Sequence, residues 1–305
     1  MSDRHALYAV VHDTTAIPGV NQLGFSLGGR AINEPSAAEL SPRFACMVEQ
    51  RPRMSFTTRA VATALGLCGV DGTDISTLTT GGLIGYQQQF ADGGSREGAT
   101  SHRKIAIAEG LLYPTRISIS HGGLAEISYE AFATYDGSND PIIITESQSL
   151  PSAPADTDRY GLGALQVGGV VIGLLTSLEI DFGLKVMADA ADSEIWPDEC
   201  WIAEFIPKIT LRTKKTKAWG ATGIPMAGSA ATHANTIFYL RHRTRTGFVA
   251  DGTASHIKFT AAGLAHFTEP FSASGTDPGE ATLVLETEND GTNDPLVIDN
   301  ASAIT

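Results

Sequence analysis

The sequence predicts a mainly β protein built from two tandem copies of one antiparallel β-sandwich or small barrel domain, each with at most a short helix. The first observation is a repeated hexapeptide, DGSNDP at 136–141 and DGTNDP at 290–295, with the copies 154 residues apart. The second is that an alternating apolar run precedes each copy and a β-branched apolar run follows it. The third is that further matches continue through most of each half at an offset of 154 or 155.

These further matches fall on residue types that shape strands and turns. Ser101-His102 matches Ser255-His256 at an offset of 154, and Gly28 matches Gly183 at an offset of 155. We therefore expect one domain at 1–152 and a second at 156–305, each of ordinary domain size. Alternating apolar residues and prolines match in the same way, among them Leu23, Phe25, Pro42 and Pro52 against Leu178, Ile180, Pro197 and Pro207.

Each hexapeptide is expected to form the turn of a β-hairpin, because Asp-Gly between two strand-like runs is a strong hairpin signal. An Asp side chain accepts hydrogen bonds from its own turn, and Gly adopts positive φ. The oxygens at alternating positions also suit calcium, but a proline enters the next strand where a further acidic ligand is required. The turn residues are Asp136, Gly137, Asp140 and Pro141, and Asp290, Gly291, Asp294 and Pro295.

The chain in order reads as short strands with one helical segment. Thr57 or Thr58 is expected to cap a helix from Arg59 to Leu67, in which Val61, Ala64, Leu65 and Cys68 share a face. The second half has a weaker, basic version of this segment at 213–219. The expected strands lie at 5–12, 22–30, 44–49, 105–108, 111–120 and 124–132, and at 257–261, 264–272 and 281–288, with a polar loop at 31–42.

Two long segments, 69–100 and 220–254, are interpreted as projecting hairpin arms for assembly. They are longer than ordinary connections, and each has an apolar centre that a lone domain would leave partly exposed. An ordinary pair of sheet strands is the equal alternative. A basic run in the second segment suits either a solvated strand face or a patch for an acidic neighbouring subunit. The candidate assembly residues are Leu83, Ile84, Tyr86 and Phe90, and Ile237, Phe238, Tyr239, Arg241, Arg243 and Arg245.

Charge and composition narrow the classes of function. The chain of 305 residues carries 21 Lys and Arg against 34 Asp and Glu, a net charge of −13. An acidic chain is a poor sequence-independent binder of nucleic acid, because that affinity comes from basic groups that neutralise phosphates. No apolar run approaches the length of a membrane span, so no membrane partner is expected. Cys46, Cys68 and Cys200 are expected to be buried free thiols.

No set of catalytic residues is predicted, and the protein is not expected to be an enzyme. Ser26 lies in a G-x-S-x-G pattern, but a hydrolase elbow requires a helix after the serine, and a loop ending in Pro35 follows instead. His102 and His256 recur with the repeat, although their neighbours form no metal-ligand set, so surface or cross-strand positions are expected. No metal or cofactor is predicted.

The arrangement resembles that of tail tube proteins of long-tailed bacteriophages. The resemblance rests on a β-rich unit of about half the chain, a proline-led run into Phe56-Thr57-Thr58 with a short helix, and a long glycine-rich segment. Gly110-Leu-Leu-Tyr-Pro114, a strand pair and the closing Asp-Gly turn follow in order. The basic helix segment of the second copy, broken at Trp219-Gly220, departs from this pattern.

The resemblance implies two tail-tube domains fused in one chain, a structural role in the virion tail and assembly in the host cytoplasm. Such domains form rings that stack into a tube, through which DNA passes without specific binding. Two domains per chain imply a ring of three chains that imitates a hexamer. The implied partners are further copies of the chain, through ring and stack contacts, and other phage tail proteins. The alternatives are another virion ring or decoration protein, a tandem β-sandwich module that binds carbohydrate, or a hydrolase using Ser26.

Overall fold

The computed structural model describes residues 4–35, 41–67, 76–78, 82–91, 94–155, 158–190, 194–214, 222, 224–225, 231–272, 274–275, 279–289, 291–292 and 294–305. Regular structure in these ranges is almost entirely β, which confirms the predicted class. The first half contains β1 (His5–His12), β2 (Thr15–Ile17), β3 (Val20–Ser26), β4 (Arg30–Pro35), β5 (Pro42–Glu49), β6 (Arg53–Thr58), α1 (Val61–Leu65), β7 (Ser76–Leu78), β8 (Leu83–Gln89), β9 (His102–Ile107), β10 (Gly110–Ser120), β11 (Glu126–Ala133) and β12 (Ile142–Gln148). The second half contains β13 (Arg159–Val167), β14 (Val170–Ile172), β15 (Leu175–Asp181), β16 (Leu184–Asp189), β17 (Glu199–Phe205), β18 (Lys208–Thr213), β19 (Ala231–Arg243), β20 (His256–Ser272), β21 (Glu280–Thr287) and β22 (Leu296–Ser302).

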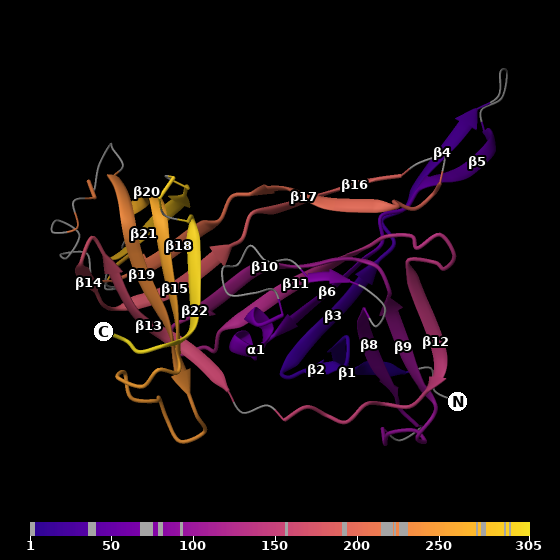
Figure 1. Ribbon diagram of the computed structural model, residues 1–305, viewed down its shortest axis with the longest axis horizontal. Helices are drawn as coiled ribbons and strands as arrows, with labels where there is room; N and C mark the ends of the chain where they lie inside the picture. The colour runs from indigo at the N-terminus through magenta and orange to yellow at the C-terminus, as the bar shows by residue number, and fades with distance from the viewer. Residues whose placement is uncertain are drawn as a thin grey trace.

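The described strands form two large antiparallel sheets and two ribbons. The smaller sheet has the order β12-β9-β8-β1-β2 and belongs to the first half. The larger sheet runs β14-β13-β19-β20-β21-β18-β15-β10-β11-β6-β3, with β22 paired to β20 and β7 paired to β10. The ribbons are β4–β5 and β16–β17. The larger sheet passes from one half of the chain into the other, so a single sheet connects the two lobes seen in Figure 1.

In the first half, the two sheets face one another across a buried core. A Cβ atom added to Gly85 in β8 would lie 2.5 Å from Leu23 Cδ2 in β3, so these strands are in close contact. The rings of Phe56 and Tyr129 stack with centroids 5.2 Å apart, and the Tyr129 hydroxyl donates to Ala64 O at 2.7 Å. This hydrogen bond ties α1 to the core, as expected for a buried tyrosine that keeps a polar partner.

The helix is shorter than the predicted range of 59–67. Its buried residues are Val61, Ala64 and Leu65, which confirms that these three share the core-facing side, whereas Cys68 lies outside the described residues. The N-cap is Ala60 and has no side-chain cap. The predicted capping by a threonine is therefore wrong: the Thr58 hydroxyl accepts from Ala60 N at 3.1 Å, one position ahead of the helix, and itself donates to Pro18 O.

The second half differs because one long strand belongs to both of its layers. β20 spans 17 residues and covers the places that β9 and β10 occupy in the first half. A glycine marks the bend in each case: Gly110 has φ of 135° and Gly263 has φ of 151°. A Cβ atom would lie 1.8 Å from Phe132 O at the first position and 2.1 Å from Glu286 O at the second. Only glycine fits where the strand turns from one layer to the other.

The strand pairings within the two halves follow the same order. β1 pairs with β2 and β8, and β13 pairs with β14 and β19. β6 lies between β3 and β11, and β18 lies between β15 and β21. β12 closes onto β9 as β22 closes onto β20. His102 and His256, which match in sequence, pair with Gln148 and Ser302, residues that are also 154 apart.

The expected polar loop at 31–42 is partly wrong. Residues 30–35 form β4, which pairs with β5 to make a ribbon that extends away from the first half (Figure 1). The second ribbon, β16–β17, instead runs back along the first half, so that its tip lies close to the base of β4–β5 (Figure 1). The strand expected at 44–49 is confirmed as part of β5, but the sequence did not predict the direction of the ribbon.

Candidate functional site

In the described parts of the two long segments, β8 and β19 are inner strands of the sheets, so the projecting-hairpin interpretation is wrong there and the alternative of ordinary sheet strands is confirmed. Contact of these segments with neighbouring subunits stays a prediction. β8 lies between β1 and β9, and β19 lies between β13 and β20. The apolar centres face the core because strand alternation places them there. Leu83 and Phe238 have no exposed surface and Tyr239 is 2% exposed, while Ile84, Tyr86, Phe90 and Ile237 are half-buried.

The basic run lies at the end of β19, beside the junction of the two halves. Arg241 forms an ion pair with Asp251 at 2.9 Å. Its guanidinium and that of Arg243 lie 5.0 and 5.2 Å from the ring centre of Phe248, within the range of cation–π attraction. Arg243 and Arg245 also line a hollow of about 370 Å³ that reaches Leu124 of the first half. Its use as a patch for an acidic neighbour stays a prediction.

The two hexapeptides do not form hairpins, so this prediction is also wrong. β11 ends before the first hexapeptide and pairs with β10 and β6, whereas β12 after it pairs with β9 in the other sheet. The same holds for β21 and β22, which are not partners. Each segment carries the chain from one layer to the other. Apolar runs flank the turn in both cases because the two runs pair with different strands. β11 and β12 belong to different sheets, whereas β21 and β22 pair with different parts of β20.

The local chemistry of the first turn agrees with the sequence. Asp136 Oδ1 accepts from the backbone N of Ser138 at 2.8 Å and of Asn139 at 2.6 Å. The Asn139 amide donates to the other carboxylate oxygen at 2.9 Å, and these hydrogen bonds hold the pKa of Asp136 below its usual range. Gly137 and Gly291 both have φ of 83°. Asp140 and Asp294 are exposed and Pro141 is buried, whereas Asp290 lies outside the described residues and Pro295 follows in a bend.

His102 and His256 are buried, and each terminates the neighbouring strand with a hydrogen bond. Both have no exposed surface. The backbone N of Gln89, at the end of β8, donates to His102 Nδ1 at 3.1 Å. The backbone N of His242, near the end of β19, donates to His256 Nδ1 at 3.0 Å. The cross-strand expectation is therefore confirmed, and the surface alternative is wrong.

Replacing His102 should alter how stability depends on pH. Burial, followed by the charges of Arg96 and His5, lowers the pKa of His102 below 6.5. In the unfolded chain His102 binds a proton near pH 6.5, whereas in the folded chain it binds one only at lower pH. The free energy of unfolding therefore falls as the pH decreases from about 6.5. His102→Asn keeps an acceptor for Gln89 N but does not titrate. We expect it to remove up to about 1.4 kcal/mol per pH unit from the acid slope.

Denaturant unfolding at pH 7.5, 6.5, 5.5 and 5.0 measures this slope. His121→Asn is the control, because the His121 side chain is exposed and should leave the slope as in the parent protein. His102→Ala should lose about 1–3 kcal/mol at every pH, since a buried N–H is then left without an acceptor. An unchanged acid slope in His102→Asn would show that the titration of His102 does not contribute to the pH dependence of stability.

The two halves are joined by a continuous strand pairing. β15, the edge strand of the second half, pairs antiparallel with β10 of the first, Arg116 lying opposite Asp181 and Ser120 opposite Ser177. Phe182 N donates to Thr115 O at 3.1 Å at one end of this ladder. His121 N donates to Thr176 O at 2.7 Å at the other end. We call this pairing the internal joint.

The internal joint buries apolar side chains of β15 and the residue that follows it. Ile180 and Phe182 have no exposed surface, and Leu178 is 1% exposed. Ile117 and Ile119 of β10 lie opposite Ile180 and Leu178 and are 0% and 5% exposed. The joint therefore has both a backbone ladder and a dry apolar side. The two halves stabilise one another through it.

The tip of the β16–β17 ribbon provides a second contact between the halves. Trp196 Nε1 donates to Gln50 Oε1 at 2.8 Å, and its ring lies 5.4 Å from the ring of Tyr135. Gln50 N donates to Ile195 O at 2.7 Å, and Tyr135 N donates to Pro197 O at 2.9 Å. The β16–β17 ribbon is thus anchored to the first half by both side-chain and backbone bonds.

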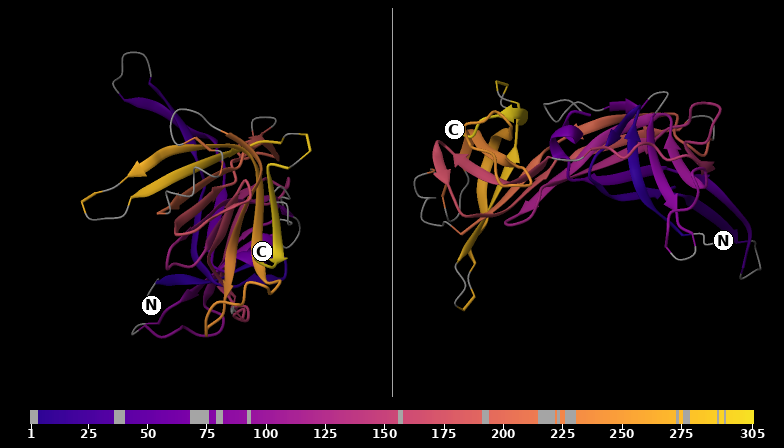
Figure 2. Two further views of the ribbon diagram at one scale, coloured as in Figure 1. Left: turned by 90° about the vertical axis from the view of Figure 1, so that its left-hand side faces the viewer. Right: turned by 90° about the horizontal axis from the view of Figure 1, so that it is seen from below.

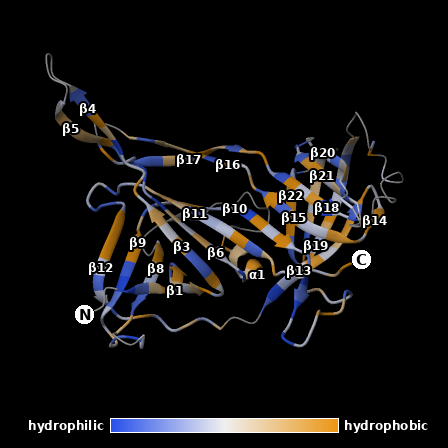
Figure 3. Cartoon of the chain, turned by 180° about the vertical axis from the view of Figure 1, so that it is seen from behind, coloured by the Kyte–Doolittle hydropathy of each residue, from blue (hydrophilic) through white to orange (hydrophobic). Residues whose placement is uncertain are grey.

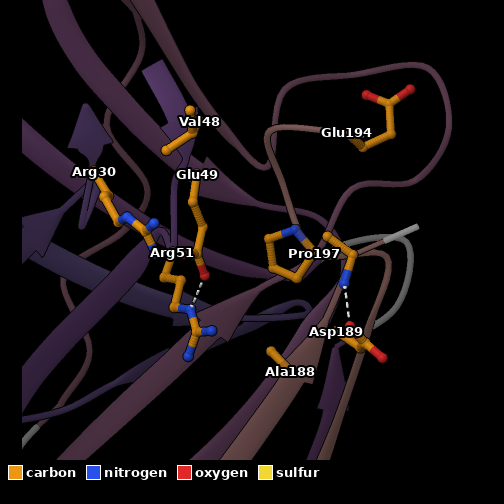
Figure 4. Close-up of a pocket in the computed structure, with 9 residues that line it drawn as sticks. Arg30, Val48, Glu49, Arg51, Ala188, Asp189, Glu194 and Pro197 are labelled. Carbon is orange, nitrogen blue, oxygen red and sulfur yellow. Dashed lines mark hydrogen bonds and ion pairs between the residues drawn. The ribbon is translucent and has the colours of Figure 1, made fainter. Parts of the chain in front are cut away.

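A pocket of about 300 Å³ lies at this contact (Figure 4). Arg30, Glu49 and Arg51 come from the base of the β4–β5 ribbon, and Asp189 and Glu194 come from the tip of β16–β17. Arg51 Nε lies 2.5 Å from Glu49 Oε1, so one arginine is already neutralised within its own ribbon. The pocket is a seam between two ribbons, and its walls carry charges of both signs.

The solvent side of the larger sheet is polar and lined by ion pairs. Hydrophilic and hydrophobic residues alternate along its strands (Figure 3). Over the internal joint, this side forms a shallow groove of about 510 Å³ bordered by Ser118, Ser177 and Thr210. The ion pairs on this side are Arg53–Glu130 at 2.7 Å, Arg59–Glu126 at 2.8 Å, Arg116–Glu179 at 3.4 Å and Lys208–Glu286 at 2.6 Å.

Ser26 and the two described cysteines lie in local environments that have a structural role. Ser26 ends β3, its hydroxyl accepts from Gly28 N at 3.3 Å, and β4 follows where a hydrolase would have a helix. Cys46 and Cys200 are free and half-buried, and burial raises the pKa of Cys200 to about 11. Within the described ranges, His, Cys, Asp and Glu form no group of three placed to hold a metal. In these same ranges no helix is long and apolar enough to cross a membrane.

Comparison with known proteins places the chain in no family: neither the protein-family models nor the curated proteins give a match.

Proposed function

We propose that this protein is a structural ring-former of a bacteriophage tail tube, with two tube domains fused in one chain. The observation that carries this proposal is the internal joint, in which an edge strand of the second half extends the sheet of the first. A subunit whose domains add to one another edge to edge is suited to building a continuous β-lined wall. An isolated domain would leave those edges open to aggregation.

Several matched details support an origin of the two halves in one duplicated domain. The Thr58 hydroxyl donates to Pro18 O, and the Thr213 hydroxyl donates to Gly173 O. Thr213 lies 155 residues after Thr58, and Gly173 lies 155 residues after Pro18. Gly28 and Gly183, also separated by 155, both have φ of 57°. Such agreement at turns and caps is expected of copies of one domain, and the parallel order of strand pairings adds to it.

The polar side of the larger sheet suits a surface that faces DNA without holding it. Affinity for phosphate comes from Lys and Arg that are free to release counterions. On this side Arg53, Arg59, Arg116 and Lys208 are each paired with a carboxylate. Exposed pairs of this kind add little stability. Their consistent pairing is more useful as a way to cancel positive charge along a conduit for DNA.

Three chains per ring follow from six domains per ring, the number implied by the resemblance to tail tube proteins. The contacts are heterologous, so they either close into a ring or extend without limit. On this proposal the partners are further copies in the ring and in the stack, together with other tail proteins. The protein would be assembled in the host cytoplasm and found in the tail of the virion.

Negative-stain microscopy of the purified protein tests this function. We expect rings or stacked tubes with a central channel, and top views with threefold symmetry that resembles sixfold symmetry at low detail. Particles that remain single elongated chains at all concentrations and salt conditions would contradict the proposal. Rings with six chains around the axis would keep the ring-forming role and overturn the trimer.

A further inference from the structure

One end of the chain exposes an edge whose counterpart is covered inside the chain. β3 corresponds to β15, and among the described strands of the larger sheet it pairs with β6 alone. Ile180 and Phe182, which the internal joint buries completely, correspond to Phe25 and Leu27 at an offset of 155. Phe25 is 45% exposed and Leu27 is 47% exposed. Two large apolar side chains are thus uncovered where the matching pair has a neighbouring strand.

The other end of the chain exposes the complementary edge. The distal part of β20 corresponds to β10, which receives β15 in the internal joint. Glu269 pairs with Thr282 as Arg116 pairs with Ser128. Thr282 lies 154 residues after Ser128, and Glu269 lies 153 residues after Arg116. The distal part of β20 and β21 form a hairpin, coloured orange to yellow in Figure 2, that extends beyond the rest of the second half. Phe271, near its end, is 65% exposed.

The charges at the two open edges are compatible with each other. In the internal joint, Arg116 lies opposite Asp181. At the open edges, Glu269 takes the place of Arg116 and Ser26 takes the place of Asp181. β3 contains no charged residue, so Glu269 would meet a neutral strand. If β3 had kept the acids of β15, like charges would lie opposite one another and oppose the pairing.

The ribbons repeat the same relationship. The β16–β17 tip lies against Gln50 of the first half, but the β4–β5 ribbon points away from its own chain (Figure 1). Phe44 and Met47 on this ribbon are 55% and 42% exposed. The place in the second half that corresponds to Gln50-Arg51 is Phe205-Ile206, where Ile206 is 57% exposed. Each end of the chain therefore presents one of the two surfaces that pair with each other between the halves of the chain.

We propose that β3 of one copy pairs antiparallel with the distal part of β20 of a second copy, in the alignment of the internal joint. This inference rests on the proposed function and specifies its ring contact. Ser26 of one copy then lies opposite Glu269 of the other. Phe25 and Leu27 become buried, and the β4–β5 ribbon extends over Ile206 of the neighbour. The occupant of each open edge is a second copy of this chain, because β15 and β10, the counterparts of the two edges, already pair within the chain.

Disulfide trapping tests this alignment. In the internal joint the hydrogen bond from Phe182 N to Thr115 O makes Arg116 and Asp181 a non-hydrogen-bonded pair. Such pairs bring Cα atoms to about 4.5 Å, within reach of a disulfide. In a background with Ser at the three native cysteine positions, Ser26→Cys with Glu269→Cys should form intermolecular disulfides under mild oxidation. Non-reducing gels should then show dimers and higher multimers that collapse to one band with reductant.

Two double-cysteine control variants calibrate the amount of disulfide formed. Arg116→Cys with Asp181→Cys should form an intramolecular disulfide, seen as loss of free thiol without a multimer. Gln22→Cys with Glu269→Cys places the thiols out of alignment, and we expect at least fivefold less multimer than with Ser26→Cys. Equal trapping of the Gln22 and Ser26 pairs would overturn the alignment.

Microscopy on the same samples separates this inference from the proposed function. Rings without trapping at Ser26 and Glu269 would overturn the alignment but leave the ring-forming role. Trapped multimers that never close into rings would support the contact and contradict the tube. Protein that shows neither trapping nor association at any concentration would overturn both.

Discussion

Phe25→Asp is expected to abolish assembly while the chain remains folded. Phe25 lies beside Met54 at the rim of the core and is 45% exposed, so the folded monomer loses only part of its apolar contact. We expect a stability loss of about 1 kcal/mol in the monomer. In the assembly, the same carboxylate would be buried in an apolar seam without a partner, which costs far more. Sedimentation velocity should show monomers where the parent protein forms rings.

Ile180→Asp is the matched control, because Ile180 occupies the corresponding place in the internal joint and has no exposed surface. There the carboxylate disrupts the chain itself, and we expect a loss of more than about 4 kcal/mol or failure to fold. Normal rings from Phe25→Asp would show that β3 does not meet a neighbour. Equal destabilisation by the two substitutions would show that Phe25 acts in the core of the monomer.

Gly110→Ala and Gly263→Ala are expected to destabilise the chain by about 2–4 kcal/mol each. At Gly110 the added methyl group would lie 1.8 Å from Phe132 O, and at Gly263 it would lie 2.1 Å from Glu286 O. Both residues also have φ values that an alanine rarely adopts. The backbone must move at the bend where a strand passes between layers. Urea unfolding followed by tryptophan fluorescence measures the loss.

Gly252→Ala is the control for these variants. A methyl group there would meet no atom within 4 Å, and its φ lies outside the positive region. We expect a change within about 0.5 kcal/mol. If Gly110→Ala is as stable as Gly252→Ala, the bend in β10 tolerates a side chain and the structural role assigned to the glycine is wrong.

The side each residue faces could be predicted from the sequence. Met54, Phe56 and Thr58 are buried and alternate with Ser55 and Thr57, as expected of a strand with one wet face. The buried face of α1 and the Asp136 turn also follow from local rules, because helix periodicity and Asx hydrogen bonding involve residues only a few positions apart.

Strand partners could not be predicted in the same way. Ile142–Gln148 follows the Asp136 turn and has the pattern of a hairpin strand, yet it pairs with β9 in the opposite sheet. Leu83–Gln89 has an apolar centre and long flanks, yet it is a central strand. Period-two alternation says that a strand has a buried side, but it is silent on which strand lies beside it.

The candidate site shows the same division. Phe25 and Ile180 match in the sequence as apolar strand residues, and nothing local distinguishes them. The difference between 45% and 0% exposure arises because β10 lies beside β15, whereas β3 has β6 as its one partner among the described strands of the larger sheet.

The mainly β class, the matched residues of the two halves and the chemistry of the turns follow from neighbours along the chain, so they could be predicted before folding was known. The pairing of β10 with β15, the different directions of the ribbons and the open outer edges of the described sheets depend on the folded arrangement. Edge pairing is made by backbone groups that every residue carries, so side-chain patterns alone do not encode it. Which edges pair depends on the shapes and charges of the two surfaces, and these exist only once each domain has folded.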